Sequence, residues 1–216
     1  MSVILYNHFR SSASWRVRIA LNWKGVAFEY VPISLVTGEH RTAEYRAHNP
    51  LQAVPTLAID GHELSESLAI IEYLEETRSE PPLLPKGALD RALVRRLAEA
   101  FNAGTQPLQN LRVLNRLESQ FGADAAAKKV WVAHFVTEIL GGVEQLMQSS
   151  AGQFSFGDRV SVADVCLIPQ LYGARRFGVD LTKFPTISRV EQQLNVLPAF
   201  ERARPALQPD CPPEER

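Results

Sequence analysis

The chain has 216 residues, of which 45% are hydrophobic and 22% are charged, and its formal net charge at pH 7 is −1. This near-neutral charge gives no reason to expect nucleic acid or an anionic membrane as a partner. No apolar run approaches the roughly 20 residues of a membrane span. The N-terminus enters a strand pattern without a cleavable leader, so we expect a cytoplasmic protein. Cys166 and Cys211 indicate neither a disulfide scaffold nor a metal site, although a bond between them stays open.

The first elements of the chain are predicted to form a strand, a helix and a second strand. Residues 3–6 are an apolar, β-favouring run, and the residues from Trp15 to Lys24 indicate a helix that stops at Gly25. Residues 27–35 alternate in polarity and predict a second strand, with Pro32 at an edge or an irregular end. A polar loop and a short helix near residues 43–47 follow.

Three serines, Ser11, Ser12 and Ser14, lie where the first strand turns into the helix. One reading is that a serine caps the helix. The other is that a hydroxyl serves a ligand, because the N–H groups and the dipole of a helix N-terminus favour an anion. The spacing Ser11-x-x-Ser14 falls where a thioredoxin-like corner carries Cys-x-x-Cys, and a serine there can only donate a hydrogen bond to another molecule's sulfur. Arg10 and Arg16 lie beside the serines.

A hairpin and a third helix are predicted next. Asp60-Gly61 between two apolar strands is a strong hairpin signal. Pro55 before it is either a strand-edge proline or part of a cis Val54-Pro55 bond. Ser67 is expected to cap the amphipathic helix at 68–76, and Glu66 is placed either for the helix dipole or to hold a ligand's ammonium group. The order β-α-β-α-β-β-α is a thioredoxin-like layout.

The remainder of the chain changes character. Residues 81–87 have the composition of a linker. The segments after it have helical periodicity without strand alternation, at residues 88–117, 124–149, 161–176 and 186–204. Bends or ends of helices are expected at Pro107, Pro169 and Pro198. We therefore expect an α/β class fold plus an all-α part. Residues 1–80 would form a thioredoxin-like domain with a mixed four-stranded sheet and helices, and residues 88–216 an all-helical domain.

Asp164 has the residue type of a catalytic group, but its surroundings predict a structural role. Ser161 and Asp164 match a capping box at the start of a helix, and Val160 and Val165 can form the accompanying hydrophobic staple. We expect Asp164 to stabilise this helix.

Together, the serine corner, Val54-Pro55, Glu66-Ser67 and Ser161-x-x-Asp164 resemble the cytosolic glutathione transferases. More narrowly, residues 11–21 are similar to the signature of the zeta class, whose members include maleylacetoacetate isomerases. Similar segments at 68–76, 106–111 and 176–182 extend the resemblance, which reaches to about Pro209. Three positions depart from the zeta pattern: Ala13 replaces a cysteine, and Glu66 and His40 stand where glutamine is usual.

The resemblance implies glutathione as the cofactor, with no metal. Ser11 would donate its hydroxyl to the glutathione sulfur and stabilise the thiolate. Arg176, with Arg10 as a second candidate, would bind the carboxylates of the substrate; surface solvation is the alternative for either arginine. The implied glutathione-binding residues are Ser11, Ser12, Ala13, Ser14, Trp15, Arg16, His40, Val54, Glu66, Ser67, Gln106, Asn110, Leu111 and Arg112. For His40, an exposed loop histidine is the alternative.

The activity that the resemblance implies is the glutathione-dependent cis–trans isomerisation of maleylacetoacetate to fumarylacetoacetate, in tyrosine and phenylalanine catabolism. It would proceed by thiolate addition, bond rotation and elimination, in a homodimer that binds a small dicarboxylate and neither nucleic acid nor membrane. Two alternatives stay open in the same class: a maleylpyruvate isomerase, and a general glutathione transferase acting on small chlorinated acids. An alternative of another class is a non-catalytic interaction protein with the transferase fold.

Overall fold

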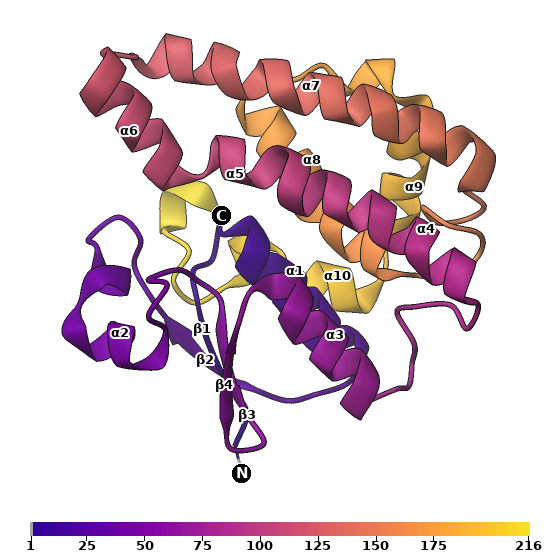
Figure 1. Ribbon diagram of the computed structural model, residues 1–216, viewed down its shortest axis with the longest axis horizontal. Coiled ribbons are helices and arrows are strands. Elements are labelled where there is room, and N and C mark those ends of the chain that lie inside the picture. The colour runs from indigo at the N-terminus through magenta and orange to yellow at the C-terminus, as the bar shows by residue number, and fades with distance from the viewer. Residues whose placement is uncertain (1) are drawn as a thin grey trace. The chain divides into compact units, whose positions relative to one another are not determined.

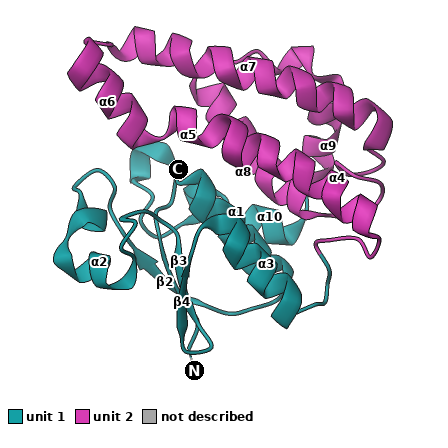
Figure 2. Ribbon diagram, viewed as in Figure 1, with its two compact units in different colours: residues 1–82, 196–216 teal, residues 83–195 magenta. Residues whose placement is uncertain are grey.

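The computed structural model describes residues 2–216 and divides them into two compact units (Figure 1, Figure 2). Unit 1 contains the chain up to Pro82 together with Val196–Arg216, and unit 2 contains Leu83–Asn195. Unit 1 is an α/β structure and unit 2 is helical, which confirms the predicted fold class.

The sheet of unit 1 has four strands: β1 (Ile4–Asn7), β2 (Glu29–Pro32), β3 (Thr56–Ile59) and β4 (His62–Ser65). They lie in the order β2-β1-β3-β4, with β1 parallel to β2 and antiparallel to β3, and β3 antiparallel to β4. The sheet is therefore mixed, as predicted. Leu5 of β1 pairs with Leu57 of β3, and both side chains are fully buried at its centre.

Helices α1 (Ser12–Trp23), α2 (Ala43–His48), α3 (Ser67–Thr77) and α10 (Pro198–Arg202) complete unit 1, with short 3₁₀ turns at Glu39–Arg41, Pro205–Leu207 and Pro213–Glu215. Along the chain to residue 77 the order is the predicted β-α-β-α-β-β-α. Ile19 of α1 and Ile70 and Leu74 of α3 are fully buried, because their apolar faces turn into the core.

The structure confirms the hairpin predicted after β3 and decides the geometry of the Val54-Pro55 bond. Asp60 and Gly61 have φ of 53° and 84°, the left-handed geometry that a two-residue hairpin turn requires. The Val54-Pro55 peptide bond is cis, which decides between the two readings of Pro55. A second cis bond joins Glu80 to Pro81.

Unit 2 contains α4 (Ala88–Glu99), α5 (Gln106–Gln109), α6 (Leu111–Phe121), α7 (Ala125–Ser150), α8 (Val162–Arg176) and α9 (Pro185–Asn195). The helical periodicity predicted over 88–117, with a bend or an end expected at Pro107, is interrupted in two places: a π-helical turn spans Ala100–Thr105, and extended Asn110 separates α5 from α6. Pro107 supplies no N–H, and the side chain of Asn110 accepts the N–H of Arg112 at 3.1 Å, which starts a new helix. Pro169 lies inside α8, which continues past it.

The predicted boundary of the helical part differs from the structure at the C-terminus. Residues 196–216 belong to unit 1. Arg18 of α1 donates to the carbonyl of Ala203 at 3.1 Å, and Asn22 donates to the carbonyl of Ala199 at 3.2 Å. Periodicity indicated the helix in this segment, but it holds no information about the unit against which that helix packs.

The prediction for Asp164 is confirmed. Its carboxylate is fully buried and accepts the N–H groups of Ser155 and Ser161, each at 2.8 Å, and the hydroxyl of Ser161 at 2.9 Å. Burial raises the pKa of Asp164, and the bonds from Ser155 and Ser161 oppose that shift. Asp164 therefore closes the capping box of α8.

Candidate functional site

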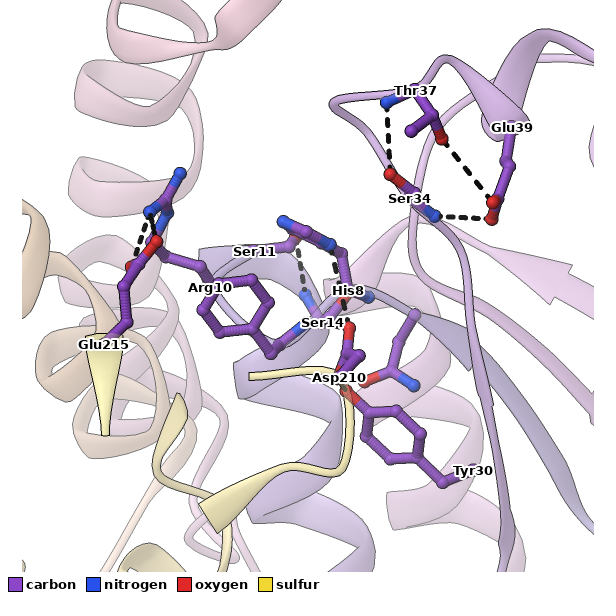
Figure 3. Close-up of polar contacts among 12 residues, drawn as sticks. His8, Arg10, Ser11, Ser14, Tyr30, Ser34, Thr37, Glu39, Asp210 and Glu215 are labelled. Carbon is purple, nitrogen blue, oxygen red and sulfur yellow. Dashed lines mark hydrogen bonds and ion pairs between the residues drawn. The ribbon is translucent and has the colours of Figure 1, made fainter. Parts of the chain in front are cut away.

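Ser11 is the N-cap of α1. Its Oγ accepts the N–H of Ser14 at 3.2 Å, and its backbone is extended, with φ −64° and ψ 120° (Figure 3). A hydroxyl has two acceptor lone pairs and one proton. The cap uses a lone pair, so the hydroxyl proton stays available to a ligand. The two readings of the serine corner are therefore compatible.

The first turn of α1 contains no acidic residue, so nothing there neutralises the positive end of the helix dipole. Ser11 and Ser12 are partly exposed. Ala13, Ser14 and Trp15 are buried, and the Oγ of Ser14 accepts the N–H of His8 at 3.5 Å. Ala13 is only 8% exposed, so the cysteine of the zeta pattern would also be buried at this position. The replacement of that cysteine by Ala13 therefore leaves the partly exposed hydroxyls of Ser11 and Ser12 unchanged.

A second part of the corner lies around the cis bond and the start of α3. Val54 is 9% exposed, and within residues 2–216 no hydrogen bond engages its backbone N–H or C=O. Glu66 has φ +67°, a strained conformation for a residue with a side chain, and it occupies the N-cap position of α3. Ser67 was expected to be the cap but is instead the first helical residue, and its hydroxyl accepts from Nη1 of Arg16 at 3.3 Å.

Arg16 is fully buried and brings a cation next to Ser67. A guanidinium beside a helix N-terminus favours an anionic group such as a carboxylate. The zwitterionic peptide glutathione needs groups of two kinds that this corner offers: the backbone N–H and C=O of Val54, which have no partner among residues 2–216, and the carboxylate of Glu66. The residues of unit 1 therefore fit this cofactor.

His40 lies in a 3₁₀ turn whose loop is held internally. The N–H of Ser34 donates to the carboxylate of Glu39 at 2.8 Å, and the N–H of Thr37 donates to the Oγ of Ser34 at 3.1 Å (Figure 3). Burial lowers the pKa of His40, with a smaller opposing effect from the backbone of Ser34. The side chain is half-buried and neutral at pH 7, so it can donate or accept a hydrogen bond.

The two arginines proposed for substrate carboxylates have different surroundings. Arg10 forms an ion pair with Glu215 at 2.6 Å (Figure 3). Arg176 is the last residue of α8 in unit 2 and is exposed. Its neighbour Arg175 makes a bidentate pair with Glu191 at 2.6 and 2.5 Å. Arg175 therefore has a structural partner of its own.

The other candidates of unit 2 lie around the junction of α5 and α6. Gln106 begins α5, and among the described residues its Oε1 is buried without a hydrogen-bond partner. Asn110 caps α6 through the N–H of Arg112, so it has a structural function. Leu111 and Arg112 are exposed at the start of α6.

Three polar residues behind the corner were missed by the sequence analysis: Arg18, Tyr30 and Asp210. Arg18 is 1% exposed and donates to Asn7 Oδ1 and to the carbonyls of His8 and Phe9, at 2.9, 3.3 and 2.7 Å. Burial lowers its pKa to about 10, so it stays charged at pH 7. An arginine among apolar helix positions was the available signal for Arg18. Asp210, in the proline-rich tail, had none.

No helix among residues 2–216 is both long and apolar enough to cross a membrane, and no group of three or more potential metal ligands occurs among them.

Known proteins share this architecture. The profile of the family described as "Glutathione S-transferase, N-terminal domain" matches residues 1–76. A probable maleylacetoacetate isomerase 2 of Drosophila melanogaster is 49% identical over 213 residues, covering 98% of this chain and 91% of that protein.

Two solved structures are also similar over nearly their full lengths. A bacterial zeta-class maleylpyruvate isomerase in its holo form has a TM-score of 0.95 and 43% identity, and the match covers 97% of this chain and all of that one. The maleylacetoacetate isomerase of Anaeromyxobacter dehalogenans, solved with glutathione in its active site, has a TM-score of 0.89 and 43% identity, with 98% of both chains covered. The fold, together with Ser11 at the start of α1 and the cis Val54-Pro55 bond, is that of a glutathione-binding transferase. The chain belongs to the glutathione transferase family, in the zeta class with the maleylacetoacetate isomerases.

Proposed function

We propose that this protein is a glutathione-dependent isomerase that converts maleylacetoacetate to fumarylacetoacetate. The observation that carries the proposal is Ser11, whose hydroxyl caps α1 through a lone pair and keeps its proton for a ligand sulfur. Relatives that are named maleylacetoacetate isomerases match almost the whole chain, which supports the same substrate.

When bound, glutathione supplies the thiolate that adds to the cis double bond and leaves after rotation. The chain's residues would hold and tune it. Ser11 would donate to the sulfur and, with the dipole of α1, lower the pKa of the thiol. Val54 would pair with the peptide through its backbone N–H and C=O, as an added strand does. Glu66 and Ser67 would hold the γ-glutamyl end, which has both an ammonium and a carboxylate, and buried Arg16 would support Ser67 from behind.

His40, Gln106, Asn110, Leu111 and Arg112 remain proposed contacts for glutathione. Gln106 is supported by its Oε1, which is buried without a hydrogen-bond partner among the described residues and can accept an N–H. The structural function of Asn110 in capping α6 leaves its amide N–H₂ able to donate.

The substrate is a dianion, so the enzyme needs cations that recognise carboxylates. We propose Arg176 for this function, because a guanidinium matches a carboxylate in bidentate geometry. Arg10 is the second candidate, and a substrate carboxylate would compete there with Glu215, with which Arg10 pairs. The A. dehalogenans enzyme has also been solved with dicarboxyethyl glutathione and citrate, which supports di- and tricarboxylate recognition in this class.

Maleylpyruvate is the second candidate substrate, because the solved structure with a TM-score of 0.95 is a maleylpyruvate isomerase. Conjugation of glutathione to small chlorinated acids would use the same thiol and cations. A non-catalytic scaffold would have no need for a proton-donating serine and unpartnered backbone groups at a cis-proline corner. We therefore favour an enzyme.

The class resemblance also supports three finer proposals: a homodimer, a cytoplasmic location and a function in tyrosine and phenylalanine catabolism. Light scattering of the purified protein tests the first of these directly.

The experiment that tests the substrate is a comparison of kcat/KM for maleylacetoacetate and maleylpyruvate, each with and without glutathione. We expect glutathione-dependent turnover with maleylacetoacetate preferred. A preference for maleylpyruvate would establish the second candidate. Binding of glutathione without turnover of either acid would indicate a transferase of other substrates, and absence of binding would indicate a scaffold.

A further inference from the structure

Asp210 lies in the C-terminal tail but contacts the loop that leads into Ser11. Its Oδ2 accepts the backbone N–H of Phe9 at 2.9 Å, and its Oδ1 accepts the hydroxyl of Tyr30 on β2 at 2.5 Å (Figure 3). Its side chain is 16% exposed. Asp210 therefore joins the tail, the second strand and the loop between β1 and α1.

The loop at His8 and Phe9 has each of its backbone polar groups bonded. The N–H of His8 donates to Ser14, and its C=O accepts from Arg18 and from the N–H of Ser11 at 3.1 Å. The C=O of Phe9 accepts from Arg18 at 2.7 Å, and its N–H donates to Asp210. Arg18 fixes the carbonyls from inside the unit. Asp210 holds the backbone of this loop from the C-terminal tail, at Phe9, two residues before Ser11.

The tail itself is held in place. Gln208, which is 6% exposed, donates from Nε2 to the carbonyls of Arg202 and Arg204 at 2.9 and 2.8 Å. Arg18 also donates to the carbonyl of Ala203. Asp210 consequently extends from an ordered support and can fix the loop at low entropic cost.

We propose that Asp210 is a positioning residue for Ser11: it holds the loop so that the Ser11 hydroxyl is aimed at the glutathione sulfur. The inference rests on the proposed function of Ser11 and deepens it. Tyr30 is the partner that orients the carboxylate of Asp210. A hydrogen-bond donor displaced by about 1 Å loses much of its effect on a reacting group, so the loop must be held as firmly as the helix cap.

The direction in which the pKa of the glutathione thiol changes separates a positioning effect of Asp210 from a simple charge effect. Asp210 is an anion, so its removal should lower the pKa of a nearby thiol by Coulomb interaction alone. Positioning predicts the opposite, because a loosened Ser11 donates less to the thiolate. The measurement is a pH titration of the thiolate's ultraviolet absorbance with glutathione bound to native protein, Asp210→Ala and Tyr30→Phe. Glu214→Gln, an exposed carboxylate on the same tail, is the matched control.

We expect the thiol pKa to rise by about one unit in Asp210→Ala, with a drop of about tenfold in kcat at pH 7, and to rise less in Tyr30→Phe, which keeps the bond to Phe9. Glu214→Gln should equal the native protein. In a Ser11→Ala background, Asp210→Ala should add no further rise, because its effect passes through Ser11. Should Asp210→Ala fail to fold, Tyr30→Phe gives the same sign. An unchanged or lowered thiol pKa in folded Asp210→Ala or Tyr30→Phe would overturn the proposal.

Hydrogen exchange without glutathione distinguishes this proposal from the proposed function. Asp210→Ala should exchange faster than native protein in the peptide spanning residues 8–14, and Glu214→Gln should not. If native protein fails to lower the thiol pKa, the proposed function is wrong. In that case the hydrogen-exchange rate of residues 8–14 still decides whether Asp210 holds the loop. An unchanged rate in Asp210→Ala would contradict the positioning proposal.

Discussion

The Oγ of Ser11 accepts the backbone N–H of Ser14 at 3.2 Å, so one hydroxyl caps α1 and keeps its proton for a ligand. These two functions can be separated by mutation. Aspartate caps a helix as well as serine does, but an ionised carboxylate donates no hydrogen bond.

We therefore predict that Ser11→Asp keeps the native stability, whereas Ser11→Ala loses about 1 kcal/mol of unfolding free energy with the cap. Both variants should raise the pKa of the glutathione thiol, and the aspartate more, because it adds a negative charge. Urea unfolding and thiolate absorbance measure the two effects. A Ser11→Asp variant with a native thiol pKa would show that the hydroxyl proton has no function.

Arg176 and Arg175 are adjacent arginines with different expected functions. Loss of a charge-assisted bond to a carboxylate weakens binding by about 1.5–3 kcal/mol, so Arg176→Ala should raise KM for maleylacetoacetate about ten- to a hundredfold. Arg175→Ala should lower stability through the lost pair with Glu191 and leave KM unchanged. Steady-state kinetics at saturating glutathione test the pair. An unchanged KM and kcat in Arg176→Ala would refute the assignment of this residue.

Asp164 is expected to affect stability alone. Asp164→Ala leaves three buried donors without an acceptor, so we predict a loss of about 2–4 kcal/mol. Asp124 is the matched comparison: it caps α7 through the N–H of Ala127 at 2.8 Å but is exposed, and its replacement by alanine should cost about 1 kcal/mol. Equal losses would contradict the effect of burial. The glutathione affinity of the folded fraction should stay native in both.

His8 gives the native state a pH dependence. Burial lowers its pKa below 6.5, Arg10 and Arg18 lower it further, and Asp210 and Glu215 oppose them. The unfolded state then binds the proton more readily than the native state, so the His8 contribution is complete above about pH 6.5 and is lost as the pH falls through the lowered pKa. Between pH 8 and 5, His8→Gln should show a shallower fall in unfolding free energy than native protein. Parallel curves would show that His8 does not contribute.

Much of unit 1 follows from short-range patterns. Asp60-Gly61 can form only a narrow range of turns, and the order of strands and helices along the chain followed from alternating polarity and helix stops. The interruption expected at Pro107 falls at the start of α5, but the further break at Asn110 was not predicted, because it depends on one capping side chain, which periodicity averages over. Each local pattern predicted that an element exists but not the residue at which its irregular end lies.

The residues of the candidate site also fall into those that local patterns predicted and those that they did not. Ser11, Glu66 and Ser67 were found because they border predicted elements, although the cap of α3 was assigned one residue late. The assignment of residues 196–216 to the helical part and the omission of Asp210 have one cause. The bond from Phe9 to Asp210 joins residues 201 positions apart, and no single-sequence pattern encodes a contact at that separation.

The most direct test of the account is the rate of maleylacetoacetate isomerisation with and without glutathione, for native protein and Ser11→Ala at equal folded concentration. We predict glutathione-dependent turnover in native protein that falls by about 10²–10³-fold in Ser11→Ala, the loss typical of removing one donor to a developing anion. Turnover that is independent of glutathione, or equal in the two proteins, would contradict the function assigned to Ser11.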